Sequence, residues 1–117
     1  MHEIAIVQAL IEQVQREVRE AGATGPVVCL ELVVGRLSGA NPDSLRFAFG
    51  MLAPGTVVEQ ARLEIAEPKA VCACRVCGAR TPIEELIVEC PACGSAQIAI
   101  VEGRQLLLQA IEVKDEG

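Results

Sequence analysis

The sequence predicts an α/β fold in which two helices pack on a small three-stranded mixed sheet, with an inserted four-cysteine, zinc-ribbon-like domain. Apolar residues recur at helical spacing in the first 21 residues and again after Asn41. Three runs rich in aliphatic and β-branched residues have the composition of strands. Two Cys-x-x-C pairs, separated by twelve residues, come before the last of these runs. Together these patterns predict a helix-and-sheet body with a metal-binding excursion.

Residues 3–21 are expected to form an amphipathic helix, followed by a strand. The apolar side chains of the helix fall on one stripe: Ile4, Val7, Ile11, Val14 and Val18. Gly22 suits the end of this helix, because glycine readily adopts the left-handed conformation that terminates helices. The run from Val27 to Gly35 has the length of one strand, and the Cys29 within it is expected to be a small buried apolar residue.

A second helix is predicted to begin at the Asn-Pro-Asp-Ser sequence of residues 41–44. Asn41 is suited to cap the helix, Pro42 fits the first helical position, and Asp43 complements the helix dipole. The expected buried stripe contains Leu45, Ala48, Phe49 and Leu52. Pro54 and Gly55 then end the helix with a turn.

Two further strands complete the predicted sheet. Val57 to Ala66 alternates between apolar and polar residues, which is typical of a half-buried strand. Gln105 to Val113 is too apolar to stand alone in water and is expected to return and pair with the earlier strands. The predicted domains are therefore an α/β domain of residues 1–68 plus 103–117 and a zinc-binding domain of residues 69–102.

The zinc-binding prediction rests on four cysteines: Cys74, Cys77, Cys90 and Cys93. Two Cys-x-x-C pairs at this spacing are the usual ligands of a tetrahedral Zn(II) ion in a small ribbon. The glycine after each pair, Gly78 or Gly94, relieves crowding where the chain turns beneath the sulfurs. A closed four-cysteine site has no free coordination position, so this zinc is expected to be structural and not catalytic.

Composition excludes several classes of function. The net charge is −6 and the pI is about 4.8, so we expect no nucleic-acid partner. Two Phe, no Trp and no Tyr leave the core aliphatic and offer no base-stacking platform. No apolar run is long enough to span a membrane, and charged residues in the first twenty positions argue against a signal peptide. We therefore expect a cytoplasmic protein whose cysteines bind metal and do not form disulfides.

The chain begins Met1-His2-Glu3, and His2 is its only histidine. A single histidine near a terminus is ordinarily solvated and idle. The alternative is a metal site, because the Met1 amine, the His2 imidazole and nearby backbone nitrogens lie within a few bonds of one another. If amide nitrogens lose their protons, these atoms form a planar nitrogen set that suits Ni(II) or Cu(II) and does not suit zinc.

The Met-His-Glu start, the NPDSLRFAFGML helix, the GTVVEQARLEI strand and the two cysteine pairs together strongly resemble the HypA/HybF family of hydrogenase maturation nickel chaperones. The resemblance covers nearly the whole chain. It implies a protein that binds Ni(II) and delivers it to the large subunit of [NiFe]-hydrogenase. The implied nickel site maps onto Met1, His2 and Glu3, with the Glu3 carboxylate as a candidate extra ligand. Implied partners are the hydrogenase large subunit, a nickel-handling maturation GTPase and, in some organisms, urease maturation proteins.

Four alternatives stand beside this interpretation. Cys72 lies two residues before Cys74 and is either a spare thiol near zinc, which we favour, or an alternative ligand. The chain as a whole is either a nickel metallochaperone or a zinc-ribbon adaptor without transferable metal. An enzyme is not expected, because a hydrolase would need an open zinc position and a general base. A dithiol oxidoreductase would use each Cys-x-x-C pair as a separate redox couple. This is not favoured, because the two pairs are better explained as the four ligands of one zinc ion.

Overall fold

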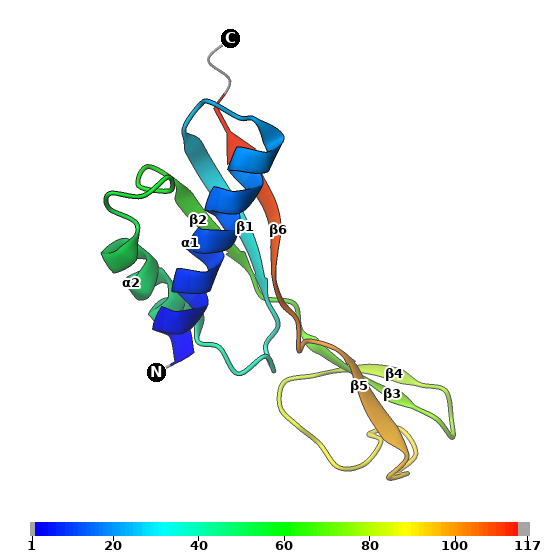
Figure 1. Cartoon of the computed structure of the whole chain (residues 1–117). Helices are drawn as coiled ribbons and strands as arrows, with labels where there is room; N and C mark the ends of the chain where they lie inside the picture. The colour runs from blue at the N-terminus through cyan, green and yellow to red at the C-terminus, as the bar shows by residue number, and fades with distance from the viewer. Residues whose placement is uncertain (1, 115–117) are drawn as a thin grey trace. The chain divides into compact units, whose positions relative to one another are not determined.

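The computed structural model describes residues 2–114 and divides the chain into two compact units (Figure 1). Unit 1 comprises residues 1–32, 40–65 and 108–117, and unit 2 comprises residues 33–39 and 66–107. The elements, in chain order, are α1 (His2–Ala21), β1 (Val27–Val34), α2 (Pro42–Leu52), β2 (Arg62–Ala66), β3 (Ala70–Cys74), β4 (Arg80–Ile83), β5 (Ile98–Glu102) and β6 (Leu106–Val113). No helix within residues 2–114 is long and apolar enough to cross a membrane.

The first sheet is the predicted three-stranded mixed sheet, with strand order β2-β1-β6. The N–H of Gly35 donates to the Gln105 carbonyl, and the N–H of Lys114 donates to the Pro26 carbonyl. These bonds lie at opposite ends of β1 and β6, so the two strands are antiparallel. The N–H of Arg36 donates to the Pro68 carbonyl just beyond the ends of β1 and β2, as expected of parallel neighbours. The expected return of the last strand to the sheet is confirmed.

Helix α1 buries the stripe that its periodicity predicts. Val7 and Val14 are fully buried, and Leu10 and Ile11 are nearly so. They contribute to an aliphatic core that includes Leu30 at the centre of β1, which is also fully buried. Gly22 has φ +70°, and its N–H donates to the Arg19 carbonyl, so it ends α1 as expected.

Helix α2 begins as the sequence predicts. The Asn41 side chain accepts a hydrogen bond from the Ser44 N–H at 3.0 Å, and Pro42 occupies the first turn. Leu45, Ala48 and Phe49 are buried. Leu52, predicted to share their stripe, is only half buried.

One predicted strand is partly wrong. Only Arg62–Ala66 of the expected 57–66 strand pairs with β1, and residues 57–60 form turns. The Thr56 hydroxyl donates to the Ala53 carbonyl and accepts from the Val58 N–H. Such local side-chain bonds compete with strand pairing. Val58, which was expected in the strand, is instead buried completely within the turn.

Unit 2 contains a second three-stranded sheet, which the sequence did not predict. Its order is β4-β3-β5, and β3 is antiparallel to both neighbours. The pairing with β5 shifts register between Val71 and Cys72, as at a β-bulge. A small core of Ala70, Cys72 and Ile83 lies on this sheet, with partly buried aliphatic residues packed around it.

Glycines bring three segments of unit 2 unusually close together. A Cβ atom added at Gly35 would lie 2.3 Å from the Gly103 carbonyl carbon, and one at Gly103 would lie 2.4 Å from the Ala70 Cα. Gly103 also has φ +99°, which other residues rarely adopt. The Leu37 N–H donates to the Gly103 carbonyl at 2.7 Å. Ala70 and Gly103, at the start and end of the cysteine segment, are therefore in close backbone contact within unit 2.

Candidate metal centres

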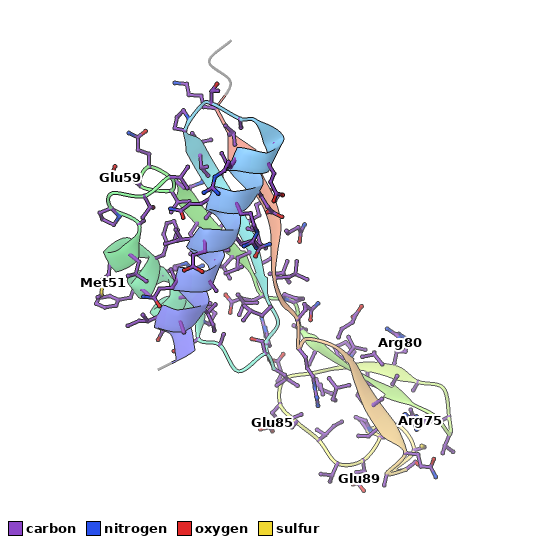
Figure 2. All side chains as sticks on the ribbon, viewed as in Figure 1. Met51, Glu59, Arg75, Arg80, Glu85 and Glu89 are labelled. Carbon is purple, nitrogen blue, oxygen red and sulfur yellow. The ribbon has the colours of Figure 1, made fainter. Side chains whose placement is uncertain are left out.

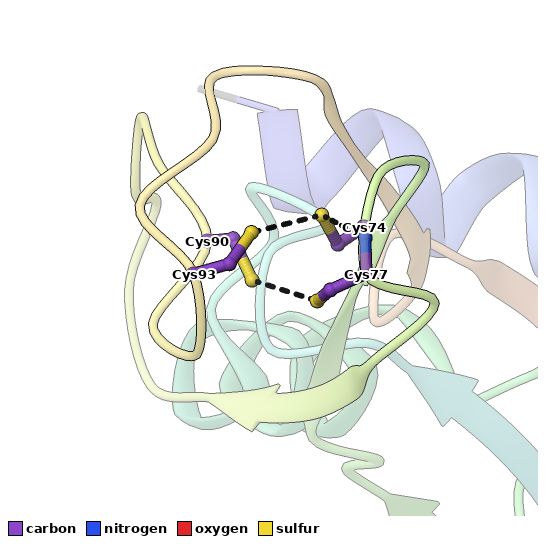
Figure 3. Close-up of side chains that lie close together, drawn as sticks. All are labelled: Cys74, Cys77, Cys90 and Cys93. Atoms are coloured by element: carbon purple, nitrogen blue, oxygen red, sulfur yellow. Dashed lines mark hydrogen bonds between the residues drawn. The ribbon is translucent and has the colours of Figure 1, made fainter.

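Four cysteine side chains converge at one end of the β4-β3-β5 sheet (Figure 3). Cys74 is the last residue of β3, and Cys77 follows in the turn toward β4. Cys90 and Cys93 lie in the second turn, which comes before β5. All four sulfur atoms lie within 4.8 Å of one another. The four cysteines that the spacing grouped are therefore together in space.

The distances between the sulfur atoms fit a tetrahedral metal site. The Cys74 and Cys93 sulfurs are 3.6 Å apart, and those of Cys77 and Cys90 are 3.7 Å apart. A zinc ion with Zn–S bonds of about 2.3 Å would separate its ligand sulfurs by about 3.8 Å. A disulfide would require about 2.05 Å, and all four cysteines are free. Thiolate sulfur is also a donor that zinc prefers, so the cluster fits Zn(II) in both geometry and chemistry.

The backbone beneath each pair is shaped to support thiolates. The N–H groups of Val76 and Cys77 donate to the Cys74 sulfur at 3.3 and 3.4 Å. In the second turn, the Ala92 N–H donates to the Cys90 sulfur at 3.3 Å. Gly78 and Gly94, the glycines expected to relieve crowding, have φ values of +77° and +79°. The N–H of each glycine donates to the carbonyl of the first cysteine of its pair, so a left-handed glycine closes both turns.

These hydrogen bonds change the acidity of the thiols. The Cys77 N–H is the largest cause that lowers the pKa of Cys74, to about 6. The Cys93 N–H is the largest cause that lowers the pKa of Cys90. The Ser95 N–H lowers the pKa of Cys93, but burial and the neighbouring sulfurs outweigh it and raise that pKa to about 12. Metal binding therefore requires the less acidic thiols of the cluster, such as Cys93, to lose their protons.

Cys72 lies outside the four-sulfur cluster. It is 1% exposed and packs in the small core with Ala70 and Ile83. Burial raises its pKa, so the thiol is held in its neutral form. This placement agrees with a spare thiol near the cluster, although its role stays a prediction.

The predicted nickel residues lie at the start of α1, only partly within the described region. Met1 lies outside it, and so does the side chain of His2. The described region includes the backbone of His2, which is the first residue of α1. Glu3 is partly buried, and its carboxylate accepts a hydrogen bond from the Asn41 N–H at 3.2 Å. No local pattern in the sequence indicates this contact, because the two residues are 38 positions apart.

The helical start has a chemical consequence for the backbone nitrogens. The first N–H groups of any α-helix have no acceptor within the helix, and they point out past its N-terminus. The amides of His2 and Glu3 belong to this first turn. A helical ψ of about −42° also turns successive backbone nitrogens toward the same side, whereas an extended ψ of about +135° separates them. The start of α1 therefore presents adjacent nitrogens suited to a chelate.

Comparisons with known proteins give a consistent result along the whole chain. A family model described as HypA, "Hydrogenase/urease nickel incorporation, metallochaperone, hypA", matches residues 1–113. The hydrogenase maturation factor HypA of Chlorobium limicola is 39% identical over 115 residues, which cover 98% of each chain. That of Moorella thermoacetica is 33% identical over 112 residues, covering 96% of this chain and 98% of its own.

The fold is also similar to solved structures. The solution structure of the Ni metallochaperone HypA from Helicobacter pylori superposes with a TM-score of 0.67 at 21% identity, covering 97% of this chain and 98% of that one. A second solution structure of a HypA protein gives a TM-score of 0.73 at 22% identity and covers 97% of each chain. At these identities the likeness concerns the fold.

Proposed function

The chain belongs to the HypA family of hydrogenase/urease nickel incorporation metallochaperones, and we propose that it binds Ni(II) at its N-terminus and delivers it for [NiFe]-hydrogenase maturation. The resemblance seen in the sequence is thus confirmed at the level of the family. The family consists of metallochaperones and maturation factors, so the chain is not an enzyme. The nickel site, the identity of the resident metal and the partners are the parts that we propose.

The proposed nickel site consists of Met1, His2 and Glu3. Met1 gives its terminal amine, His2 gives its imidazole and backbone nitrogen, and Glu3 gives its backbone nitrogen. Four nitrogens of this kind form a planar set, which Ni(II) accepts and zinc does not favour. The observation that carries the proposal is that α1 begins at His2, so the amides of His2 and Glu3 are free of helical hydrogen bonds.

The Glu3 side chain has a separate role in this proposal. Its carboxylate already accepts from the Asn41 N–H, and Asn41 caps α2. That contact ties the beginning of α1 to the beginning of α2, so it holds the chelating backbone in place. We therefore assign the Glu3 carboxylate to positioning and leave nickel binding to its backbone nitrogen.

We propose that the four cysteines hold a structural Zn(II). The sulfur distances, the N–H donors to Cys74 and Cys90 and the closed arrangement of four thiolates all support this assignment. Zinc would join two turns of unit 2 that are separated in sequence. With four protein ligands it offers no position for substrate, so its contribution is to folding.

Nickel is the cargo, and its site must therefore exchange. A terminal chelate satisfies this need, because its ligands lie within three residues and can be released one at a time to an acceptor. The proposed acceptor is the large subunit of [NiFe]-hydrogenase. A nickel-handling GTPase and urease maturation proteins are the other proposed partners.

Nickel titration of the zinc-loaded, untagged protein tests the proposed function. The expected result is one tightly held zinc and one exchangeable Ni(II) per chain, with the optical spectrum of square-planar nickel in nitrogen ligands. Zinc alone, with no specific nickel binding, would instead support the adaptor interpretation. Metal content before and after dialysis against a weak chelator distinguishes the two kinds of site.

A further inference from the structure

An apolar groove lies in unit 1 beside the start of α1. It is lined by Ile4 of α1 and by Asp43, Ser44, Phe47, Ala48 and Met51 of α2, and its volume is about 520 Å³. Figure 2 labels Met51 on this helix. The groove is formed where the first turn of α1 approaches the outer side of α2. Most of the lining therefore comes from α2, and α1 adds the apolar side chain of Ile4.

Two large apolar side chains of this groove, Phe47 and Met51, are exposed and do not contribute to the core. Phe47 is 72% exposed and Met51 is 57% exposed, and they are four residues apart, so they lie on the same face of α2. Phe49, the only other aromatic residue in the chain, is 7% exposed. Helix α2 thus has a second apolar face besides its buried one. Exposed aromatic and methionine side chains are typical of surfaces that bind another protein.

The position of the groove relates it to the nickel terminus. Ile4 is two residues after His2, and the Glu3 carboxylate binds the Asn41 N–H at the start of α2. This step rests on the proposed function. An acceptor can take nickel only if its donor atoms come within bonding distance of the ion, so it must cover the surface around residues 1–3. The groove is the apolar part of that surface within the described residues of unit 1.

The charges beside the groove define the partner further. Asp43 is 96% exposed, and its ion pair with Arg46 is long, at 3.5 Å, and lies on the surface. Such a pair is weak and leaves the carboxylate available. Glu3, whose carboxylate binds the Asn41 N–H at the start of α2, is a second acidic residue beside the groove. We infer that this groove is the docking surface for the protein that accepts nickel, and that the acceptor presents an apolar side chain flanked by Lys or Arg.

Nickel transfer to the nickel-free large-subunit precursor of the same organism's hydrogenase tests this inference. The Phe47→Ala/Met51→Ala double variant should keep the nickel affinity of the unmodified chain but transfer nickel at least about tenfold more slowly, as expected when two anchoring side chains are lost. Val88→Ala is the matched control, because Val88 is apolar, 84% exposed and belongs to unit 2. It should change neither affinity nor transfer.

A charge variant tests the rim. Asp43→Lys should weaken association with the precursor and reduce its dependence on salt concentration, because an attraction becomes a repulsion. Equal transfer rates for the unmodified chain and the double variant would overturn the docking inference while the proposed function stands. A double variant that loses nickel affinity would overturn it too, because the groove would then support the metal site.

Two other outcomes are also decisive. An unmodified chain that binds nickel but passes none to the precursor would contradict the choice of acceptor, whereas one that binds no nickel would contradict the proposed function itself. Sedimentation analysis tests whether a second copy of the chain occupies the groove. If the unmodified chain is a dimer and the double variant is a monomer, the groove is a self-association surface and the inference is wrong.

Discussion

His2 is the residue on which the nickel proposal depends. It is the only histidine of the chain, and it stands at the first position of α1. Replacing His2 by Ala should abolish high-affinity nickel binding, because the chelate loses its only imidazole. The fold should persist, since the core is built from the aliphatic stripe that begins later in α1. Isothermal titration with Ni(II), together with circular dichroism, measures both effects.

A matched control for this substitution is Gln8→Ala, an exposed change further along the same helix. It should leave nickel affinity and helix content unchanged. If His2→Ala retains full affinity, the site must lie elsewhere, and the thiols around Cys72 would be the next place to search.

Proton competition gives a second test at the residue scale. The imidazole and the terminal amine must both be unprotonated to bind nickel, and their ordinary pKa values are about 6.5 and about 7.7–8.0. Nickel affinity should therefore fall as the pH is lowered through this range. Titrations at several pH values with zinc content monitored in parallel check this. Affinity that stays constant from neutral pH to pH 5 would exclude both groups as ligands.

Sequence reasoning succeeded for residues whose roles follow from local spacing and failed for contacts between distant residues. The four cysteines could be grouped because each Cys-x-x-C pair bends around one ion, and the structure brings their sulfurs within 4.8 Å. The contact between Glu3 and Asn41 had no local pattern to indicate it. The exposure of Phe47 was equally hidden, because a pattern of apolar residues does not tell which of two helix faces is covered.

At the scale of elements, the helices were predictable and one strand was not. The stripe of α1 and the Asn41 cap of α2 are local signals, and both appear as expected. The 57–66 strand was overestimated because the Thr56 hydroxyl stabilises a turn that competes with strand pairing. Strands β3, β4 and β5 are only four or five residues long, too short for a reliable periodic signal.

The third prediction concerns the proposed zinc site and the β4-β3-β5 sheet beside it. Cys90→Ser should release zinc and disorder residues 70–100, because the small core of Ala70, Cys72 and Ile83 cannot hold that sheet alone. The helices of unit 1 should remain, since they have their own core. Zinc analysis and amide hydrogen exchange resolved by region make the measurement.

Cys29→Ala is the control for the zinc prediction. Cys29 is also a buried thiol, 3% exposed, but it lies in β1 and outside the four-sulfur cluster. This variant should keep zinc in full. If Cys90→Ser unfolds the whole chain cooperatively, the proposed division into an α/β domain of residues 1–68 plus 103–117 and a zinc-binding domain of residues 69–102 is wrong.

At the scale of the whole molecule, the predicted fold class is confirmed. Two helices and a mixed three-stranded sheet are present, and the four-cysteine segment is an insertion before the last strand. The insertion could be inferred because the apolar strand at residues 106–113 had to return to the sheet. The tight packing of Gly35 against Gly103 could not be inferred from the sequence, because it depends on segments far apart in the chain.

The central claim is that a terminal amine anchors the nickel, and a short N-terminal extension tests it most directly. An extension converts the Met1 amine into an amide, so the chelate loses the basic nitrogen that holds the ion while the amide nitrogens of His2 and Glu3 give up their protons, although both residues remain. The account predicts that an uncleaved extension weakens nickel binding about as much as His2→Ala and removes the square-planar spectrum, whereas a C-terminal extension does neither. Unchanged affinity and an unchanged spectrum in the N-terminally extended protein would contradict it.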